Sequence, residues 1–544
     1  MDKLEKFILK CTLENAVKYG GKSDLNSVLG SVFAKEKKAD KPYIISLTKK
    51  IVDNVNTLLL SQQEEQLNEL GHLKKQIKRK KDPSLPNVKG KVVMRFAPNP
   101  NGYMSFGHIR PALWNWFFVQ KYKGTYIVRF DDTDPRTKVP LKEAYKSIQQ
   151  DLKWLCINPH KIIIQSKRLK IYYTYAAQLI KQGNAYIDTL PAEQMKKMLW
   201  DQKISDEREE SPAEVMKKWK KMFTYYKDGE AILRIKTNIN HPNPSLRDWP
   251  AFRIITKPKH PLVNARVWPL LNFASAIDDH ELKVTHIIRG IDLEVSDDKQ
   301  KFIYNYFKWK YPETIYHGKF FISDISSTSE AIELIKEKKL TGWDDPRLGT
   351  VAALRKRGFQ AQSIVNFIHD LGIGRSDFNV NIDSLAAHNR EIIDKKAKRF
   401  FVVFNPKNVK IDNAPKMKIK TQCHPDFPNL GYRIFHTSNK FYVDETFEPS
   451  KYYRFIDLFN FINLKHVSTE LNPNLKAKPI HWLPVTKNLV KIHLVMPDNS
   501  VQRGLGEPAL KKVKVGDIVQ FMRIGFARCD KKLKNEIIFY FAHK

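Results

Sequence analysis

The sequence predicts a multidomain α/β protein, and three observations support this fold class. Strand, loop, helix, strand and helix signals follow one another from residue 91 to 155, as in a doubly wound α/β domain. Helical spacing of apolar residues precedes this region, and short strand signals separated by Pro, Asn and Gly follow it. At 544 residues the chain exceeds the usual size of one domain, so several domains are expected.

Residues 1–90 are predicted to form an N-terminal helical domain. Apolar residues recur at helical spacing until Gly20-Gly21 ends the run, and a later helix is expected through 52–59. The basic run at 74–81 precedes a Pro-containing linker. It indicates a solvated helix end, with RNA contact as the alternative.

Residues 91–340 are predicted to form the doubly wound domain. LysValValMetArgPheAlaPro at 91–98 is typical of a buried strand followed by a turn. A helix is expected to open near Gly107, and TyrIleValArgPhe at 126–130 predicts a second buried strand. Since strands and helices alternate here, the sheet should be parallel.

The α/β alternation is interrupted at 185–262, which is predicted to be an insertion with a small sheet of its own. The pattern returns with a strand at 283–289, and residues 341–400 are predicted to be helical. From 401 to 544 short strand signals predict a β-barrel region, ending in a strand signal at 518–527.

The charge balance favours a polyanionic partner. Lys plus Arg number 94 against 58 Asp plus Glu, which gives a formal net charge of +36. Such an excess attracts nucleic acid, although adaptation to an unusual cytoplasm would also produce it. The four cysteines form no CxxC pair, which predicts a reduced cytoplasmic chain without structural zinc. No stretch approaches the roughly 18 apolar residues of a membrane span, and the N-terminus lacks a signal-peptide core.

The segment ArgPheAlaProAsnProAsnGlyTyrMetSerPheGlyHisIleArg at 95–110 combines a strand end, a turn and a helix start. Unpaired N–H groups and the helix dipole make such a place suitable for phosphates. Gly107 would let a ligand approach the backbone, and His108 could donate to phosphate oxygens. A glycine–histidine pair alone is more typical of a plain strand-to-helix turn.

This longer segment resembles the "HIGH" region of class I glutamyl- and glutaminyl-tRNA synthetases, where ATP binds. The resemblance implies that Pro98, Ser105, Gly107 and His108 contact ATP. Ser105 stands where the motif has its first histidine, so more depends on His108. In the family, the arginine that matches Arg95 binds the side-chain end of the amino acid, and Ala97 is expected to lie beside that substrate. A guanidinium suits a carboxylate because it can donate two parallel hydrogen bonds.

ArgPheAspAspThrAspPro at 129–135 places three carboxylates after the second strand. From the residues alone, a capped turn and a metal site are both open, because the carboxylates repel unless cations face them. The family resemblance implies instead that Asp131 holds the α-ammonium group of the amino acid, and that no protein metal site is present.

The segment at 269–290 resembles the second substrate-binding segment of the family. Arg289 matches an arginine of glutamyl enzymes, where glutaminyl enzymes have an uncharged residue, so Arg95 and Arg289 together predict a pocket for an acidic side chain. A salt bridge from Arg289 to Asp292 or to a neighbour is the structural alternative. Leu271 replaces a tyrosine of the family and contributes no hydrogen bond to the pocket.

AspIleSerSerThrSer at 324–329 matches the family's lysine-bearing "KMSKS" loop without any lysine. The resemblance implies that Ser327, Thr328 and Ser329 bind ATP phosphates through hydroxyl and backbone N–H groups. A capped helix start at Ser327 fits the same residues.

The resemblance covers nearly the whole chain and implies a Rossmann-like class I catalytic domain, an inserted acceptor-stem-binding domain, a stem-contacting helical region and a β-barrel anticodon-binding domain of archaeal type. It implies glutamate–tRNA ligase activity with L-glutamate, ATP with Mg²⁺, and tRNA(Glu), and leaves tRNA(Gln) open as a second substrate. A glutaminyl enzyme and a non-catalytic tRNA-binding relative are the alternatives. Arg289 argues against the first. Ser105, Leu271 and the lysine-free loop are the reasons to consider the second.

Overall fold

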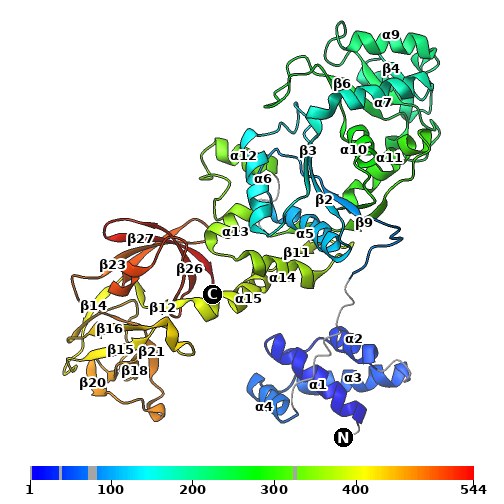
Figure 1. Ribbon diagram of the computed structural model, residues 1–544. Coiled ribbons are helices and arrows are strands. Elements are labelled where there is room, and N and C mark those ends of the chain that lie inside the picture. The colour runs from blue at the N-terminus through cyan, green and yellow to red at the C-terminus, as the bar shows by residue number, and fades with distance from the viewer. Residues whose placement is uncertain (1–2, 36–39, 71–82, 323–327) are drawn as a thin grey trace. The chain divides into compact units, whose positions relative to one another are not determined.

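The computed structural model describes residues 3–35, 40–70, 83–322 and 328–544 (Figure 1). It divides into two compact units, Met1–Asp82 and Pro83–Lys544. The basic run at 74–81 and Ser327, both singled out in the sequence, lie outside the described residues.

Helices are the only regular secondary structure among the described residues of the first unit. Apolar side chains of its helices pack into two small buried clusters, one around Ile8 and Ile44 and one around Leu13 and Leu67. The helix expected through 52–59 ends earlier, because the chain turns after Val55 and a new helix starts at Leu60. The helices are α1 (Lys3–Lys18), α2 (Leu25–Lys35), α3 (Lys41–Val55) and α4 (Leu60–Leu70).

A five-stranded parallel sheet lies at the centre of the second unit, and it confirms the doubly wound prediction. Its strands, in spatial order, are β3 (Lys161–Ile164), β2 (Thr125–Phe130), β1 (Val93–Phe96), β8 (His286–Gly290) and β9 (Glu313–His317). The order runs outward from β1 in one direction and from β8 in the other. In such sheets a crevice opens outside the carboxyl ends of the two central strands, here β1 and β8.

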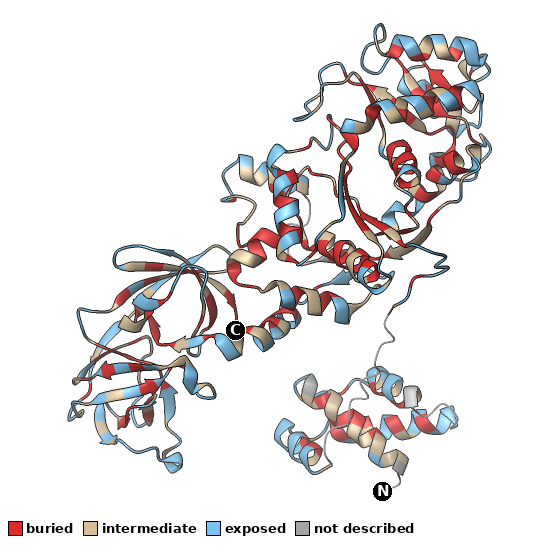
Figure 2. Cartoon of the chain, in the orientation of Figure 1, coloured by how far each residue is buried: buried red, intermediate tan, exposed pale blue. Residues whose placement is uncertain are grey.

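Helices cover both faces of this sheet, as right-handed crossovers require (Figure 1). Two connect the strands from β1 to β3, and one connects β8 to β9. Burial follows this arrangement, with the strands and the inner sides of the helices buried (Figure 2). The helices are α5 (Phe106–Lys121), α6 (Lys142–Trp154) and α11 (Glu294–Tyr306), and α10 (Leu271–Glu281) leads into β8.

The segment between β3 and α10 carries an antiparallel four-stranded sheet of its own, in the order β4-β5-β6-β7. Its hydrophobic core, built around Trp219, Phe252 and Trp268, continues into α10 and α11 through Phe273 and Ile303. The insertion is therefore packed firmly against the helices that border the crevice. Its elements are α7 (Leu169–Lys181), β4 (Ala185–Asp188), α8 (Ala192–Trp200), α9 (Pro212–Met222), β5 (Ile232–Ile235), β6 (Pro250–Ile254) and β7 (Val267–Pro269).

Helices follow β9 and lead to the strand-rich region. The short strand β11 interrupts the helical region predicted at 341–400, and it pairs in parallel with β10, which precedes that region. The elements are β10 (Phe320–Phe321), α12 (Thr328–Lys336), α13 (Val351–Arg357), α14 (Ala361–Leu371), β11 (Phe378–Asn379) and α15 (Ile382–Ile393).

The C-terminal region is rich in strands, and its largest sheet has seven, in the order β12-β25-β26-β27-β23-β24-β13. Only Phe401 separates the two terminal strands of this sheet, so it nearly closes on itself as a barrel. The signal at 518–527 proves to be two strands, because the chain turns between β25 and β26, with positive φ at Arg523 in the turn and at Gly525 where β26 begins. The strands of the large sheet are β12 (Lys398–Phe400), β13 (Val402–Phe404), β23 (Val490–Val495), β24 (Val501–Gly506), β25 (Ile518–Phe521), β26 (Gly525–Lys532) and β27 (Glu536–His543).

Smaller sheets complete this region around a second core that contains Phe441, Phe455 and Trp482. Their strands are β14 (Lys407–Lys410), β15 (Lys418–Gln422), β16 (Tyr432–His436), β17 (Lys440–Val443), β18 (Tyr453–Phe455), β19 (Asn460–Ile462), β20 (Lys465–Ser468), β21 (Lys478–Ile480) and β22 (Leu483–Pro484).

Candidate functional site

A cavity of about 580 Å³ lies at the carboxyl ends of β1 and β8, where the strand order reverses. Four residues predicted from distant parts of the sequence line it together: Arg95 at the end of β1, His108 on α5, Asp131 after β2 and Arg289 at the end of β8. The sequence-predicted residues Ala97, Pro98 and Leu271 also line it.

Arg95 belongs to a buried ion network that the sequence did not reveal. Its Nε and Nη2 atoms donate to Asp279 on α10, at 3.1 and 3.3 Å. Arg129 Nη1 donates to the same carboxylate at 2.6 Å and Arg129 Nε to Asp131 at 2.7 Å. Burial alone would raise the pKa of Asp279, but the two guanidinium groups outweigh it and lower that pKa. The network fixes the direction of Arg95 before any ligand binds.

Asp131, by contrast, has a raised pKa. Burial is the main cause, and the neighbouring Arg129 and Arg95 only partly oppose it. Ser275 also donates to Asp131, at 3.3 Å. A ligand ammonium group beside this carboxylate would favour its charged form and so would gain binding energy from it.

The other two carboxylates of the 129–135 segment have different surroundings. Asp132 is fully buried and accepts hydrogen bonds from the hydroxyl groups of Tyr145 at 2.6 Å and Ser166 at 2.7 Å. Asp134 accepts from Arg253 at 2.5 Å and caps the following turn. Each of these two carboxylates therefore has hydrogen-bond donors of its own.

Arg289 contacts the helix that follows it. Its Nη1 atom is hydrogen-bonded to Asp297 on α11, and Nη2 donates to Gln300 at 3.4 Å. The salt bridge considered from the sequence thus exists, with Asp297 as partner in place of Asp292. The buried Nε atom of Arg289 and the buried Oδ1 atom of Asn272 have no hydrogen-bond partner among the described residues, and both residues line the cavity. These two groups can serve a ligand.

His108 is positioned by the start of its own helix. The Ser105 backbone N–H donates to His108 Nδ1 at 3.2 Å, and the Ser105 hydroxyl lies 3.0 Å from the same nitrogen. Since Nδ1 accepts, the proton of the neutral ring is on Nε2, which is free to donate. Burial lowers the pKa of His108 to about 4, so the ring acts as a neutral donor near pH 7.

The loop before α5 is fastened to the segment before α13. Phe106 N–H donates to the Gly349 carbonyl and Val351 N–H to the Met104 carbonyl, both at 2.8 Å. The rings of Tyr103 and Trp343 stack at 5.4 Å.

Gly102 lies in the loop before α5, close to both Thr328 and Trp343. A Cβ atom added there would lie 2.4 Å from Thr328 Cγ2 and 2.8 Å from the Trp343 ring. Thr328 therefore lies beside the loop before α5, although neither Thr328 nor the exposed Ser329 lines the cavity. Ser105 and Gly107 also lie outside its lining.

Sequence reasoning missed Asp279, Arg129, Asp297 and Lys299. Lys299 lines the cavity from α11, and burial lowers its pKa. Arg129 had a visible signal, because an arginine in the otherwise apolar strand signal TyrIleValArgPhe must find a buried partner. The others had none, since their contacts depend on how helices pack.

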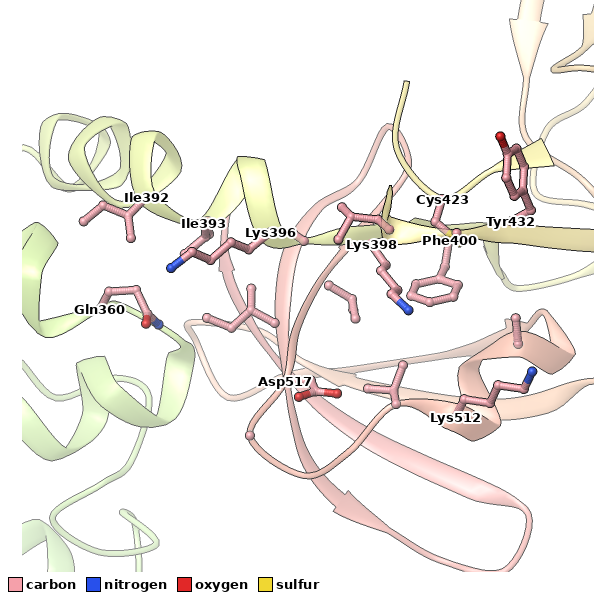
Figure 3. Close-up of a pocket in the computed structure, with 18 residues that line it drawn as sticks. Gln360, Ile392, Ile393, Lys396, Lys398, Phe400, Cys423, Tyr432, Lys512 and Asp517 are labelled. Carbon is pink, nitrogen blue, oxygen red and sulfur yellow. The ribbon is translucent and has the colours of Figure 1, made fainter. Parts of the chain in front are cut away.

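A second cavity, of about 560 Å³, lies where α15 meets the strand-rich region (Figure 3). Apolar residues such as Ile393, Phe400 and Val519 line it together with Lys396, Lys398 and Lys512. Apolar walls can pack against a nucleobase, and lysine ammonium groups can bind phosphate, so the lining of this cavity suits a nucleotide.

Among the described residues, no group of three or more His, Cys, Asp or Glu side chains is arranged to hold a metal ion. In the same residues, no helix has both the length and the apolar character needed to span a membrane.

Comparisons with known proteins find relatives over nearly the whole length of the chain. A family model described as tRNA synthetases class I (E and Q), catalytic domain, matches residues 91–395, and one described as the anti-codon binding domain matches 479–530. A glutamate–tRNA ligase of Pyrococcus furiosus is 41% identical and covers 99% of this chain and all of its own length. Glutamate–tRNA ligases of Methanocaldococcus jannaschii and Thermococcus kodakarensis are each 40% identical, over 99% and 100% of this chain.

Proposed function

The chain belongs to the class I tRNA synthetases of the glutamate and glutamine group, and from that premise we propose that it is a glutamate–tRNA ligase. One observation carries the proposal. Arg95, Asp131, Arg289 and His108, which are up to 194 positions apart (289 − 95), line a single cavity at the crevice of the parallel sheet.

The amino acid binds between the two arginines and Asp131. The side-chain carboxylate accepts hydrogen bonds from Arg95 and from the free Nε–H of Arg289, and Asp131 accepts from the α-ammonium group. Leu271 and Ala97 form apolar walls. Because Leu271 replaces the family tyrosine, the side-chain carbonyl oxygen of the neighbouring Asn272 provides a polar group in place of the tyrosine hydroxyl. The network of Arg129 and Asp279 holds Arg95 and Asp131 at fixed positions, which reduces the entropic cost of binding.

ATP lies at the start of α5, against Pro98 and His108. The Nε2–H of His108 donates to a phosphate oxygen, and the helix dipole favours negative charge at this end. Gly107 leaves room for the nucleotide, and Ser105 orients the His108 ring. The hydroxyl groups of Thr328, Ser329 and Ser327 take the place of the lysine-bearing loop, and Mg²⁺ enters with ATP as part of the substrate.

The reaction has two steps. An oxygen of the glutamate α-carboxylate attacks the α-phosphorus of ATP, the bond to the β-phosphate breaks, and pyrophosphate leaves. A ribose hydroxyl of the terminal tRNA adenosine then attacks the activated carbonyl carbon, loses its proton, and releases AMP. The protein contributes position and fixed charge, because ATP supplies the leaving group.

RNA contacts are assigned to three other parts of the chain. The insertion at 185–262 grips the acceptor stem, the helical region at 341–400 contacts the stem, and the strand-rich region at 401–544 binds the anticodon. The match of residues 479–530 to an anticodon-binding domain supports the last assignment. The cavity of Figure 3 is the first place to look for a bound anticodon base, since lysines and apolar side chains line it. The cytoplasm, where tRNA is charged, is the expected location.

The test is aminoacylation of purified tRNA(Glu) and tRNA(Gln) with labelled glutamate or glutamine. Charging of tRNA(Glu) with glutamate is expected, and preference for glutamine would overturn the proposal. Nothing in the comparisons supports charging of tRNA(Gln), so that arm decides a separate question. Arg289→Ala should raise the KM for glutamate far more than the KM for ATP, whereas the exposed Arg136→Ala should change neither. Equal effects on both substrates would contradict the pocket role of Arg289.

A further inference from the structure

The charges of the substrate cavity balance without its lysines. Arg95 is paired with Asp279 at 3.1 Å, Arg253 with Asp134 at 2.5 Å, and Arg289 with Asp297. Behind the cavity, Arg129 is paired with Asp131 at 2.7 Å. Four guanidinium groups thus face four carboxylates: Arg95, Arg129, Arg253 and Arg289 against Asp131, Asp134, Asp279 and Asp297.

This balance changes what the two predicted arginines can do. Arg95 and Arg289 can direct N–H groups at a ligand, but their charges are already neutralised by carboxylates of the chain. If a neutral amide were bound, the charges of Arg95 and Arg289 would therefore still be compensated by Asp279 and Asp297. The arginines alone give only part of the free-energy difference between binding glutamate and binding glutamine.

Two lysines complete the cationic lining, Lys138 and Lys299, and they differ in exposure. Lys138 is exposed to solvent, while Lys299 is partly buried. None of the ion pairs in the described parts of the chain involves Lys299. Desolvation without a nearby carboxylate lowers the pKa of this amine. An anion at Lys299 would thus relieve an existing cost.

Lys299 also lies in the right part of the cavity. Ser296, Lys299 and Gln300 are three and four positions apart on α11, so they share one face of the helix, and all three line the cavity. Gln300 accepts a hydrogen bond from Arg289 at 3.4 Å. The lysine is therefore adjacent in sequence to the residue that orients the predicted side-chain ligand Arg289.

We propose that Lys299 neutralises the side-chain carboxylate of the bound amino acid and so sets the preference for the acid over its amide. The inference rests on the proposed function, in which glutamate is the substrate. Glutamate carries a net charge of −1, and once its ammonium group faces Asp131, the remaining negative charge requires a cation that the arginines do not supply. Glutamine leaves Lys299 without a counter-ion in a partly buried site, which disfavours its binding.

The experiment compares Lys299→Gln, Lys299→Met and Lys299→Arg in the full-length enzyme with tRNA present. Aminoacylation kinetics are measured with glutamate, glutamine and ATP. Lys299→Gln and Lys299→Met should raise the KM for glutamate by about tenfold or more and lower the ratio of kcat/KM for glutamate over glutamine by a similar factor. The KM for ATP should change less than about twofold, and Lys299→Arg should retain most of the discrimination.

Two control variants separate this role from a general effect of charge. Lys301→Gln removes an exposed lysine on the same helix that is paired with Asp298 at 3.1 Å. Lys138→Gln removes the exposed cation of the cavity. Lys301→Gln should behave as the wild-type enzyme. Lys138→Gln should lower the ratio of kcat/KM for glutamate over glutamine far less than Lys299→Gln does, because Lys138 is exposed to solvent.

The inference fails if Lys299→Gln leaves the KM for glutamate unchanged. It also fails if kcat/KM falls equally for both amino acids, or if Lys138→Gln has the same effect. Thermal melting of each variant verifies folding, and Lys299→Met and Lys299→Arg keep the test decisive if one variant is unstable. Failure of the proposed function is distinct, because it would appear as a wild-type enzyme that does not charge tRNA with glutamate.

Discussion

Gly102 and Gly107 lie on the same loop-to-helix segment, and the structure predicts opposite effects for the same substitution. At Gly102 an added methyl group would overlap Thr328 at 2.4 Å and Trp343 at 2.8 Å. At Gly107 the nearest atoms would be the Phe320 carbonyl oxygen at 3.6 Å and Ser105 Oγ at 3.7 Å, which are ordinary contacts. Packing therefore requires glycine at 102 but not at 107.

The expected magnitudes follow from these distances. Gly102→Ala must push apart the loop and the segment that begins α12, which costs about 1–3 kcal/mol of stability, as overpacking usually does. Gly107→Ala lies in the first turn of α5 and should stabilise it by at most about 1 kcal/mol, because alanine loses less backbone entropy in a helix than glycine. If Gly107 leaves room for ATP, this more stable variant should nevertheless raise the KM for ATP by about tenfold, equivalent to roughly 1.4 kcal/mol.

Two measurements distinguish the packing role of Gly102 from the ligand-binding role of Gly107. Hydrogen exchange of peptides that cover α5 and the 98–105 loop reports local stability, and ATP–pyrophosphate exchange with tRNA present reports ATP use. Gly107→Ala should keep or increase protection while it loses ATP affinity, and Gly102→Ala should lose protection. A Gly107→Ala enzyme with wild-type ATP kinetics would refute the ligand role of Gly107, and a Gly102→Ala enzyme with unchanged protection would refute the packing argument.

Three further predictions concern stability and RNA binding. Asp279→Asn removes the carboxylate shared by Arg95 and Arg129 and should lower the free energy of unfolding by about 3–5 kcal/mol, measured by denaturant titration; a loss below about 1 kcal/mol would show that the network is not coupled to folding. Burial raises the pKa of Asp151 to about 7 because only Arg355, at 3.4 Å, opposes it. The folded state therefore binds an extra proton between the ordinary pKa of an aspartate and about pH 7, so stability from this group is present at low pH and is lost as the pH rises through 7. Asp151→Asn should flatten the pH dependence of the melting temperature between pH 5 and 8, and an unchanged profile would contradict the assignment. Because the chain has a net charge of +36, tRNA affinity should fall steeply between about 50 and 200 mM salt, by about 10³-fold if six phosphates are contacted. A flat response in filter binding would exclude an electrostatic interface.

The sequence was sufficient wherever the signal was local. Three features follow from residues that are neighbours in the chain: the buried strand before the 98–105 loop, the helix that begins after this loop, and the alternation of strands and helices that predicts a parallel sheet. Backbone hydrogen bonding and apolar spacing are short-range properties, so a local pattern is sufficient to predict them. The resemblance of 95–110, 129–135 and 269–290 to a known family then placed Arg95, His108, Asp131 and Arg289 at one ligand site, and the structure brings these four residues to one cavity. Errors were small: the helix expected through 52–59 stops at Val55, the strand β11 lies within the region predicted to be helical, and the strand signal at 518–527 is two strands.

What the sequence could not predict is the set of partners that decides the charge of the site. Asp279 meets Arg95 across 184 positions, and Arg289 pairs with Asp297 rather than Asp292 because α11 turns that carboxylate toward β8. Lys299 is left as a partly buried cation, without an ion pair among the residues that the structure describes, only after these pairs have formed. The sequence determined which ionisable groups exist and which lie at strand ends. Tertiary packing decided which of them neutralise one another, since an ion pair depends on distances of a few ångström between segments that no local pattern relates.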